Sequence, residues 1–275
     1  MDAAALLREA RLDEALAALQ ADIRRSPADA RLRILLFQLL AIGGQWERAG
    51  SQLGVVGELD AKALPMVQTY RTALACEAFR AAVFAASKTP LLFGDPEQWI
   101  ARMLQALAQG AQGHHQEAER FRAEALEQAP AVAGEIDGQR FEWIADADSR
   151  LGPVFEAIVN GKYYWIPFHR LRTIAIEPPE DLRDLVWMPV RLTFANGGES
   201  VALVPTRYPG SESHADAAIR MARKTDWTQA SGNTYIGLGQ RMFATDAADY
   251  ALMDVRRIQL EPATQDSEPQ GAGDA

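Results

Sequence analysis

The chain has 275 residues, of which 48% are apolar and 24% charged, the composition of an ordinary globular protein. Its formal net charge of -9 argues against a nucleic-acid partner and against docking on anionic lipid, because both depend on clustered Lys and Arg. A single cysteine, Cys76, excludes an internal disulfide framework and a thiolate metal cluster, which fits a reducing cytoplasm.

The N-terminal stretch MDAAALLREARLDEAL mixes acidic and basic side chains and lacks the basic-then-apolar order of a signal peptide. A charge-free apolar run, Ile34 to Trp46, is too short to span a bilayer. We therefore expect a soluble, cytoplasmic protein with no membrane segment.

Residues 1–145 show a helical repeat. Three stretches place small or apolar residues, followed by a helix-ending position, in the order of the second helix of a tetratricopeptide repeat. They are Ala15, Leu19 and Pro27; Ala49, Leu53 and Ala61; and Ala118, Ala125 and Pro130. A plain bundle would also show amphipathic faces, but the first two sets recur at the tetratricopeptide period, which favours a tetratricopeptide-like domain. Such arrays present a concave groove that holds a partner peptide or helix.

Between these stretches the sequence predicts helices around Val67 to Ala86, in which Cys76 is a small buried residue. The segment KTPLLFGDPEQW then predicts a loop. In it, Asp95 as N-cap and Pro96 in the first turn are expected to open the next helix.

The segment that joins the two halves, DADSRLGPVFEAIVNGKYYWIPF, predicts a helix followed by a strand. Leu151, Phe155, Ile158 and Val159 lie on one helical face, which Pro153 would start and Gly161 would stop. In the strand that follows, side chains alternate, so Tyr163 and Trp165 face one way while Tyr164 and Ile166 face the other. The aromatic row is therefore expected to fill two packing faces and not to form one ligand platform.

Residues 146–262 predict a small, mainly antiparallel α+β domain or partly open barrel. Asn196-Gly197-Gly198 is a hairpin signal between two apolar runs. One helix, SHADAAIRMARKTDW, is expected to interrupt the strands, and Gly237 and Gly239 indicate a curved strand. The polar tail, residues 263–275, is expected to be disordered. The fold class is thus α+β and multidomain, with helical repeats first.

Catalytic motifs such as G-x-S-x-G and H-E-x-x-H are absent from the sequence. Glu142, Asp146 and Asp148, with Arg150 and Glu156, could form a cation or general acid–base site, to which His169 could contribute. The alternative is a capping and ion-pairing network at the junction, which we prefer because no nucleophile or second ligand cluster accompanies these carboxylates. His169 is then a packed histidine at a strand end, and His114 and His115 are solvated residues.

The junction also resembles the ImpE family, known as TagJ or SciE, whose members are accessory proteins of bacterial type VI secretion. The resemblance rests on D-x-R-L-G-P followed by G-x-Y-x-W-I-P and covers nearly the whole chain. The matching positions are Asp148, Arg150, Gly152, Pro153, Gly161, Tyr163, Trp165, Ile166 and Pro167. The resemblance implies a helical part joined to an α+β part, no catalytic residues, and association with the N-terminal helix of the small subunit of the contractile sheath. It also implies an effect on sheath assembly or on sheath recycling by a dedicated AAA+ ATPase, a second expected partner.

The function expected from residues and resemblance together is a non-enzymatic adaptor without metal or cofactor, which holds an amphipathic helix in a hydrophobic groove. The aromatic candidates for this groove are Trp46, Tyr70, Phe79 and Trp99. The competing hypothesis is a cation-dependent hydrolase that uses Glu142, Asp146 and Asp148 with His169.

Overall fold

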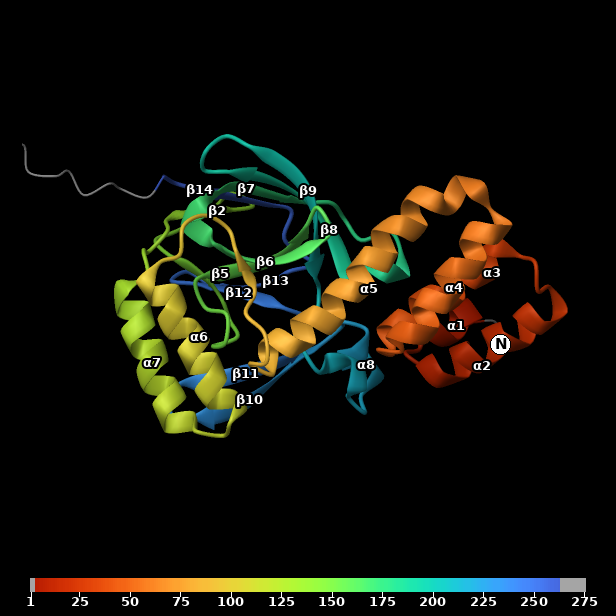
Figure 1. The fold of residues 1–275 in the computed structure, drawn as a ribbon, viewed down its shortest axis with the longest axis horizontal. Helices are drawn as coiled ribbons and strands as arrows, with labels where there is room; N and C mark the ends of the chain where they lie inside the picture. Colours follow the sequence, from red (N-terminus) through yellow and green to blue (C-terminus); the bar gives the residue numbers. More distant parts are fainter. Residues whose placement is uncertain (1–2, 263–275) are drawn as a thin grey trace, which may run out of the picture.

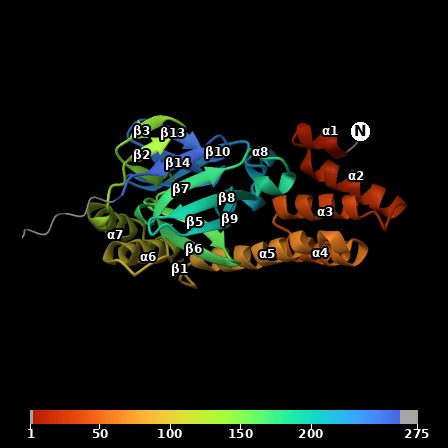
Figure 2. The same cartoon turned by 90° about the horizontal axis from the view of Figure 1, so that it is seen from above.

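The computed structural model describes residues 3–262, in which an N-terminal helical region is followed by a largely antiparallel sheet region (Figure 1). The predicted α+β class is confirmed. The helices of the first region are α1 (Ala3–Arg8), α2 (Leu12–Arg25), α3 (Ala30–Ile42), α4 (Trp46–Leu59), α5 (Leu64–Phe84), α6 (Gln98–Ala111) and α7 (His115–Gln128). The helices α1 to α4 gather at one end of the molecule and α6 and α7 at the other, and the long α5 runs between them (Figures 1 and 2).

The repeat positions lie where small residues let helices approach closely. Ala15 in α2 and Ala49 in α4 are fully buried, and so is Ala125 in α7. Each of these three helices packs against the helix that precedes it in the chain. The helices are therefore as predicted, and their assignment as tetratricopeptide-like repeats stays a prediction.

The start of α6 differs from the prediction. This helix begins at Gln98 with Glu97 in the N-cap position, two residues after Asp95. The carboxylate of Glu97 makes no cap bond, because it accepts hydrogen bonds from Trp99, His169 and Arg170. These contacts fix the helix start, so the local capping signal at Asp95 and Pro96 was misleading.

The main sheet has nine strands in the described chain, in the order β1-β6-β5-β9-β8-β7-β14-β2-β3. Its pairings are antiparallel except for β1 with β6. The strands are β1 (Leu91–Leu92), β2 (Gly134–Ile136), β3 (Gln139–Phe141), β5 (Val154–Val159), β6 (Lys162–Pro167), β7 (Leu171–Ile176), β8 (Trp187–Phe194), β9 (Glu199–Pro205) and β14 (Arg257–Leu260). The segment predicted as a plain loop thus contributes β1.

Smaller elements complete the second region. A three-stranded sheet joins β4 (Ile144–Asp146), β12 (Met242–Thr245) and β13 (Asp249–Ala251), and a ribbon joins β10 (Thr225–Ser231) and β11 (Thr234–Gly239). Short helical turns are η1 (Ala61–Ala63), η2 (Phe168–Arg170), η3 (Leu182–Leu185) and η4 (Ser211–Ser213). In β11, a Cβ on Gly237 would lie 2.3 Å from the ring of Tyr208, so this glycine permits close packing.

The predicted junction helix over residues 151–161 is wrong. Residues Val154–Val159 form β5, which is buried along its whole length and pairs with β6. Between the two strands, Asn160 and Gly161 both have positive φ, +48° and +75°, as a tight hairpin turn requires. Gly161 therefore turns a hairpin and does not stop a helix. The spacing looked helical because β5 is buried on both faces, so apolar residues occupy both sides of the strand and the usual alternation is lost.

The helix expected in SHADAAIRMARKTDW is also mostly wrong. Only Ala217–Arg220 is helical, as α8. Ala222 has a φ of +53°, which ends the helix, and from Thr225 the chain pairs with β11. The predicted hairpin at Asn196-Gly197-Gly198 is confirmed, because it joins β8 and β9.

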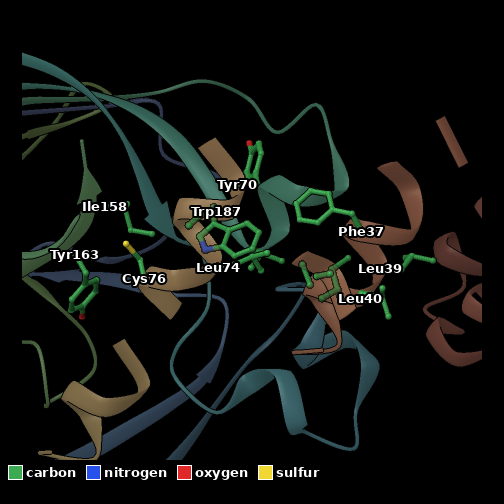
Figure 3. Packing of buried hydrophobic residues seen from close by; sticks show 14 of the residues in the cluster. Phe37, Leu39, Leu40, Tyr70, Leu74, Cys76, Ile158, Tyr163 and Trp187 are labelled. Atoms are coloured by element: carbon green, nitrogen blue, oxygen red, sulfur yellow. The ribbon is translucent and has the colours of Figure 1, made fainter. Parts of the chain in front are cut away.

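Two hydrophobic cores lie on opposite faces of the main sheet. Tyr163 and Trp165 of β6 face the core that is shared with the helices, whereas Ile166 faces the other core and Tyr164 packs against it. The predicted division of the aromatic row is confirmed. Figure 3 shows the shared core around Trp187 of β8. The indole of Trp187 lies 6.5 Å from the ring of Phe37 in α3 and 5.7 Å from that of Tyr70 in α5.

The predicted domain boundary between residues 145 and 146 falls inside β4. The strands β2 and β3 precede it and belong to the main sheet. The division into domains stays a prediction, and the predicted disordered tail lies outside the described residues. Over residues 3–262, none of the helices combines the length and the apolar character that a membrane crossing needs.

Candidate functional site

A buried ionic network joins α5 to the sheet, and Glu156 of β5 is at its centre. Glu156 is fully buried. Arg80 of α5 donates to it from Nε at 2.8 Å and from Nη2 at 2.6 Å, and Tyr163 donates its hydroxyl proton at 2.6 Å. The Nη1 of Arg241 lies 3.2 Å from the same carboxylate. Glu156 therefore receives two guanidinium groups and one phenol, and both of its oxygens are engaged.

The network extends to Asp146 of β4. Arg241 donates to Asp146 Oδ2 from Nε at 2.9 Å and from Nη2 at 2.7 Å, and the hydroxyl of Tyr208 donates to Oδ1 at 3.1 Å. The backbone N–H of Asp148 donates to the same Oδ1 at 2.9 Å. Through Arg241, the three-stranded sheet is thus tied to the main sheet.

On the helical side, Arg80 also donates to the carbonyl oxygen of Arg207, and Glu77 accepts the indole N–H of Trp187 at 2.9 Å. The buried guanidinium of Arg207 donates to the carbonyl of Ile42 at 2.7 Å, at the C-terminal end of α3. Helix carbonyls at this end carry partial negative charge and lack intrahelical partners. The network therefore fixes α3 and α5 against the strands.

Burial and ion pairing act in opposite directions on the pKa values in this network. Burial raises the pKa of Glu156, but Arg80 and Arg241 outweigh it, so the pKa lies below its ordinary value. Burial raises the pKa of Asp146 to about 6, although Arg241 opposes this. Burial also lowers the pKa of Arg207 to about 10.

The predicted acidic cluster is brought together only in part: Asp146 and Glu156 share Arg241, whereas Asp148 has a separate ion pair and Glu142 lies outside the network. Asp148 pairs with Arg150, with Nη2 and Oδ2 2.6 Å apart, and it accepts the N–H of Gly237 at 2.8 Å. Asp146 is bound as described above, and Glu142 is exposed. Among residues 3–262, no group of three or more His, Cys, Asp and Glu side chains could hold a metal ion. The contacts of Asp146 and Asp148 are those of a structural ion-pairing network.

His169 is likewise engaged in packing. Its Nε2 lies 2.9 Å from Glu97 Oε1, and its ring contacts that of Trp99. Burial lowers the pKa of His169, against the opposing effect of Glu97. His114 takes the N-cap position of α7 and His115 begins the helix; both are exposed.

The four aromatic residues predicted to bind a partner lie apart. Trp46 and Tyr70 both contact Trp187, whereas Phe79 contacts Tyr163, and Trp99 is buried at the start of α6. Tyr70 is also buried. Their part in partner binding stays a prediction, and the structure offers a more accessible apolar surface.

This surface is a groove of about 420 Å³ beside the junction motif, which we call the junction groove. One wall is the end of α7 with Leu126 and the following Pro130, and the other is Trp143 with β4. Gly152 and Pro153 of the motif line it as well. Leu126 is 50% exposed and Trp143 is 40% exposed, so two large apolar side chains reach the surface within one groove.

Exposed apolar side chains continue beyond the groove. A neighbouring hollow is lined by Trp227 and Tyr235 and shares Ala147 and Ala244 with it. In the described chain, eight large hydrophobic side chains are exposed, and four of them, Leu126, Trp143, Trp227 and Tyr235, line these two hollows. Such clustering is typical of interaction surfaces, whereas single apolar residues are scattered over any protein surface.

Two residues of the junction motif, Gly152 and Pro153, line this surface. The turn of Asp148 and Arg150 fixes the chain that leads to Gly152 and Pro153. Gly152 has a φ of +53°, and a Cβ there would lie 3.5 Å from the end of Met103. Pro167 pairs with Val154 at the end of β6. The remaining motif residues, Gly161, Tyr163, Trp165 and Ile166, belong to the β5–β6 hairpin and the two cores and are not among the groove-lining residues.

Sequence reasoning missed the groove and most of the ionic network. Leu126 and Trp143 gave only a weak signal, as large apolar residues next to glutamates, Glu127 and Glu142. Nothing in the sequence showed that α7 and β4 face each other. Likewise, Arg80, Arg207 and Arg241 are far apart in the chain, and no local pattern connects them.

Comparisons with known proteins agree with the family resemblance. Residues 138–259 match the family described as ImpE protein. The chain is 55% identical over 262 residues to the type VI secretion system accessory component TagJ of Pseudomonas aeruginosa, which covers 95% of this chain and 92% of that relative. The fold is similar to the crystal structure of protein VPA1032 from Vibrio parahaemolyticus, with a TM-score of 0.86 and 26% identity. That match covers 94% of this chain and 97% of the other.

Proposed function

The chain belongs to the ImpE family, and on this premise we propose that it is a non-enzymatic adaptor of a type VI secretion system. It binds the amphipathic N-terminal helix of the small subunit of the contractile sheath and acts in the cytoplasm. Through this contact it influences sheath assembly or sheath recycling by the dedicated AAA+ ATPase, which is a further partner. The Pseudomonas aeruginosa relative, TagJ, is an accessory component of such a system.

The junction groove is the observation that supports this proposal. A helix that lies in a groove inserts apolar side chains spaced at i, i+3 or i+4, and i+7. Leu126, Trp143 and Pro130 offer apolar walls for such side chains, and the groove has room for more than one of them. Aromatic residues at the centre of an interface contribute most to binding, which gives Trp143 the main role.

The ionic network has a supporting role in this proposal. Asp146 lines the groove and Asp148 follows two residues later, and their contacts with Arg241 and Arg150 hold the β4 segment in place. A rigid wall lowers the entropy cost of binding, because little has to be ordered when the helix docks. The four predicted aromatics, Trp46, Tyr70, Phe79 and Trp99, are not among the residues that line the junction groove.

The experiment is a titration of the full chain with a synthetic peptide of the sheath-subunit helix, followed by calorimetry. We expect saturable binding in the micromolar range or tighter, since about 8 kcal/mol corresponds to 1 μM. Trp143→Ala should weaken binding by about tenfold or more, as truncation of an interface aromatic does. Leu59→Ala is the matched control, because Leu59 is similarly exposed but lies at the end of α4.

Two results would contradict the proposal. If the unmodified peptide shows no saturable binding at tens of micromolar, the partner is wrong. If the peptide binds but Trp143→Ala and Leu59→Ala behave alike, the partner is right and the junction groove is not its site.

A further inference from the structure

One guanidinium beside the junction groove has almost no partners. Arg122 of α7 is only 8% exposed. Its Nη1 donates to Thr234 Oγ1 at 2.7 Å, and its buried Nε has no hydrogen-bond partner. A guanidinium offers five N–H donors, so most of the capacity of Arg122 is unused within the described chain.

The other buried arginines have more hydrogen-bond and ion-pair partners than Arg122. Arg80 and Arg241 each face carboxylates, and Arg207 donates to backbone carbonyl groups. Arg122 forms no ion pair within the described residues. A buried charge without a counter-ion is costly in free energy. An anion bound beside Arg122 would therefore stabilise its guanidinium group.

The two carboxylates whose charge acts on Arg122, Asp148 and Glu119, are bonded to other groups. Asp148 is taken by Arg150 and by the N–H of Gly237. Glu119 accepts from the hydroxyl of Ser231 and from the N–H of Asn233. Burial lowers the pKa of Arg122, and Asp148 and Glu119 oppose this only from a distance.

Arg122 is accessible from the groove despite its burial. It lines the junction groove and also a smaller cavity of about 130 Å³ between α6, α7 and the β10–β11 ribbon. Arg122 and Leu126 are four residues apart on α7, so they lie on the same face of the helix. A segment that packs an apolar side chain on Leu126 can therefore present an acidic side chain to Arg122 one turn away.

We propose that Arg122 is the anion-binding residue of the junction groove, and that the segment docked there carries a carboxylate beside its apolar anchors. This inference rests on the proposed function, and it specifies the chemistry of the partner. The fork of a guanidinium binds a carboxylate through two parallel hydrogen bonds, which gives both orientation and register to the docked helix. The apolar walls favour a carboxylate that arrives on a peptide over a free anion.

The test is a double-mutant cycle by calorimetry on the full chain. The probe is the synthetic sheath-subunit helix, with its acidic residues replaced one at a time by the matching amides. Arg122→Met should weaken binding of the unmodified peptide by about tenfold or more. One amide peptide should lose the same factor with the wild-type protein and nothing further with Arg122→Met. Arg120→Met is the control, because Arg120 lies on the same helix but is exposed and paired with Glu117.

A second measurement separates this role from a structural one. Because Arg122 lacks a counter-ion, Arg122→Met should leave the urea midpoint of the free protein unchanged or raise it. Equal peptide affinity of wild type and Arg122→Met would overturn the inference while leaving the proposed function intact. A large loss of stability with unchanged affinity would also overturn it, since Arg122 would then be structural.

If the unmodified peptide does not bind at all, the proposed function fails, and benzoate at millimolar concentration tests Arg122 alone. A rise of the thermal midpoint in wild type but not in Arg122→Met supports an anion site, because a ligand stabilises the state that it binds. The same response in both proteins, or none, overturns the inference.

Discussion

Removal of the charge on Glu156 should destabilise the protein more than most single substitutions. Glu156→Gln keeps the size of the side chain but leaves Arg80 and Arg241 buried with one carboxylate fewer, and it points an N–H₂ donor at other donors. Removing one partner from a buried ion pair costs about 3–5 kcal/mol, because the other charge stays buried. With a denaturant slope of about 2–3 kcal/mol/M, the urea midpoint should fall by about 1–2.5 M.

The assay is urea unfolding followed by circular dichroism, with Glu199→Gln as control. Glu199 is an exposed glutamate at the start of β9, so its substitution should change the free energy of unfolding by less than about 0.5 kcal/mol. If Glu156→Gln unfolds at the same midpoint as this control, the network does not join α5 to the sheet, and our reasoning is refuted.

The same pair predicts a pH dependence. The pKa of Glu156 is lowered in the folded protein, so its stabilising contribution is complete above the unfolded value of 4.5 and is lost as the pH falls through the folded pKa. The difference in unfolding free energy between wild type and Glu156→Gln should therefore be largest near pH 7 and shrink below about pH 4.5. A difference that stays constant from pH 7 to pH 3 would contradict this assignment.

Three further predictions concern the turn, the core and the thiol. Gly161→Ala should lower the free energy of unfolding by about 1–2 kcal/mol in urea, because the φ of Gly161 is +75° and the new Cβ would lie 2.6 Å from Thr72 Cγ2. An unchanged urea midpoint would contradict the hairpin turn between β5 and β6. Trp187→Phe should lower the free energy of unfolding by about 2–4 kcal/mol, because Glu77 loses a hydrogen-bond donor and the shared core loses volume. Urea unfolding measures this loss, and a loss below about 0.5 kcal/mol would contradict the prediction. Cys76 is buried, and burial raises its pKa to about 11. A thiol reagent at pH 8 should therefore modify Cys76 only as fast as the protein unfolds. Rapid labelling of the folded protein would contradict the buried position of Cys76.

Parts of the fold could be predicted because the local signals were unambiguous. The helices that contain Ala15, Ala49 and Ala125 combine amphipathic spacing with small buried positions, and the β8–β9 hairpin follows from Asn196-Gly197-Gly198. In β6 the alternation of Tyr163 and Trp165 with Ile166 was enough to assign both faces. Each of these features depends on residues that are close in the sequence.

The errors came from segments whose structure depends on distant contacts. β5 is buried on both faces, so its apolar spacing resembled a helix, although Asn160-Gly161 was a hairpin signal that could have corrected this. The segment from Thr225 became a strand because it pairs with β11, against its helical pattern. The junction groove and the place of Arg122 in it could not be predicted, because residues of α7 and β4 that are distant in the sequence line one groove only in the folded chain.

Site-specific photo-cross-linking from the junction groove tests the central claim most directly. Leu126 would be replaced by p-benzoylphenylalanine in the full chain, with the same replacement at Leu59 as control, and each protein irradiated with the full-length small sheath subunit. We predict a cross-link from position 126 to the N-terminal helix of that subunit and none from position 59. Binding of the subunit with no cross-link from position 126, or with equal cross-links from both positions, would contradict the account.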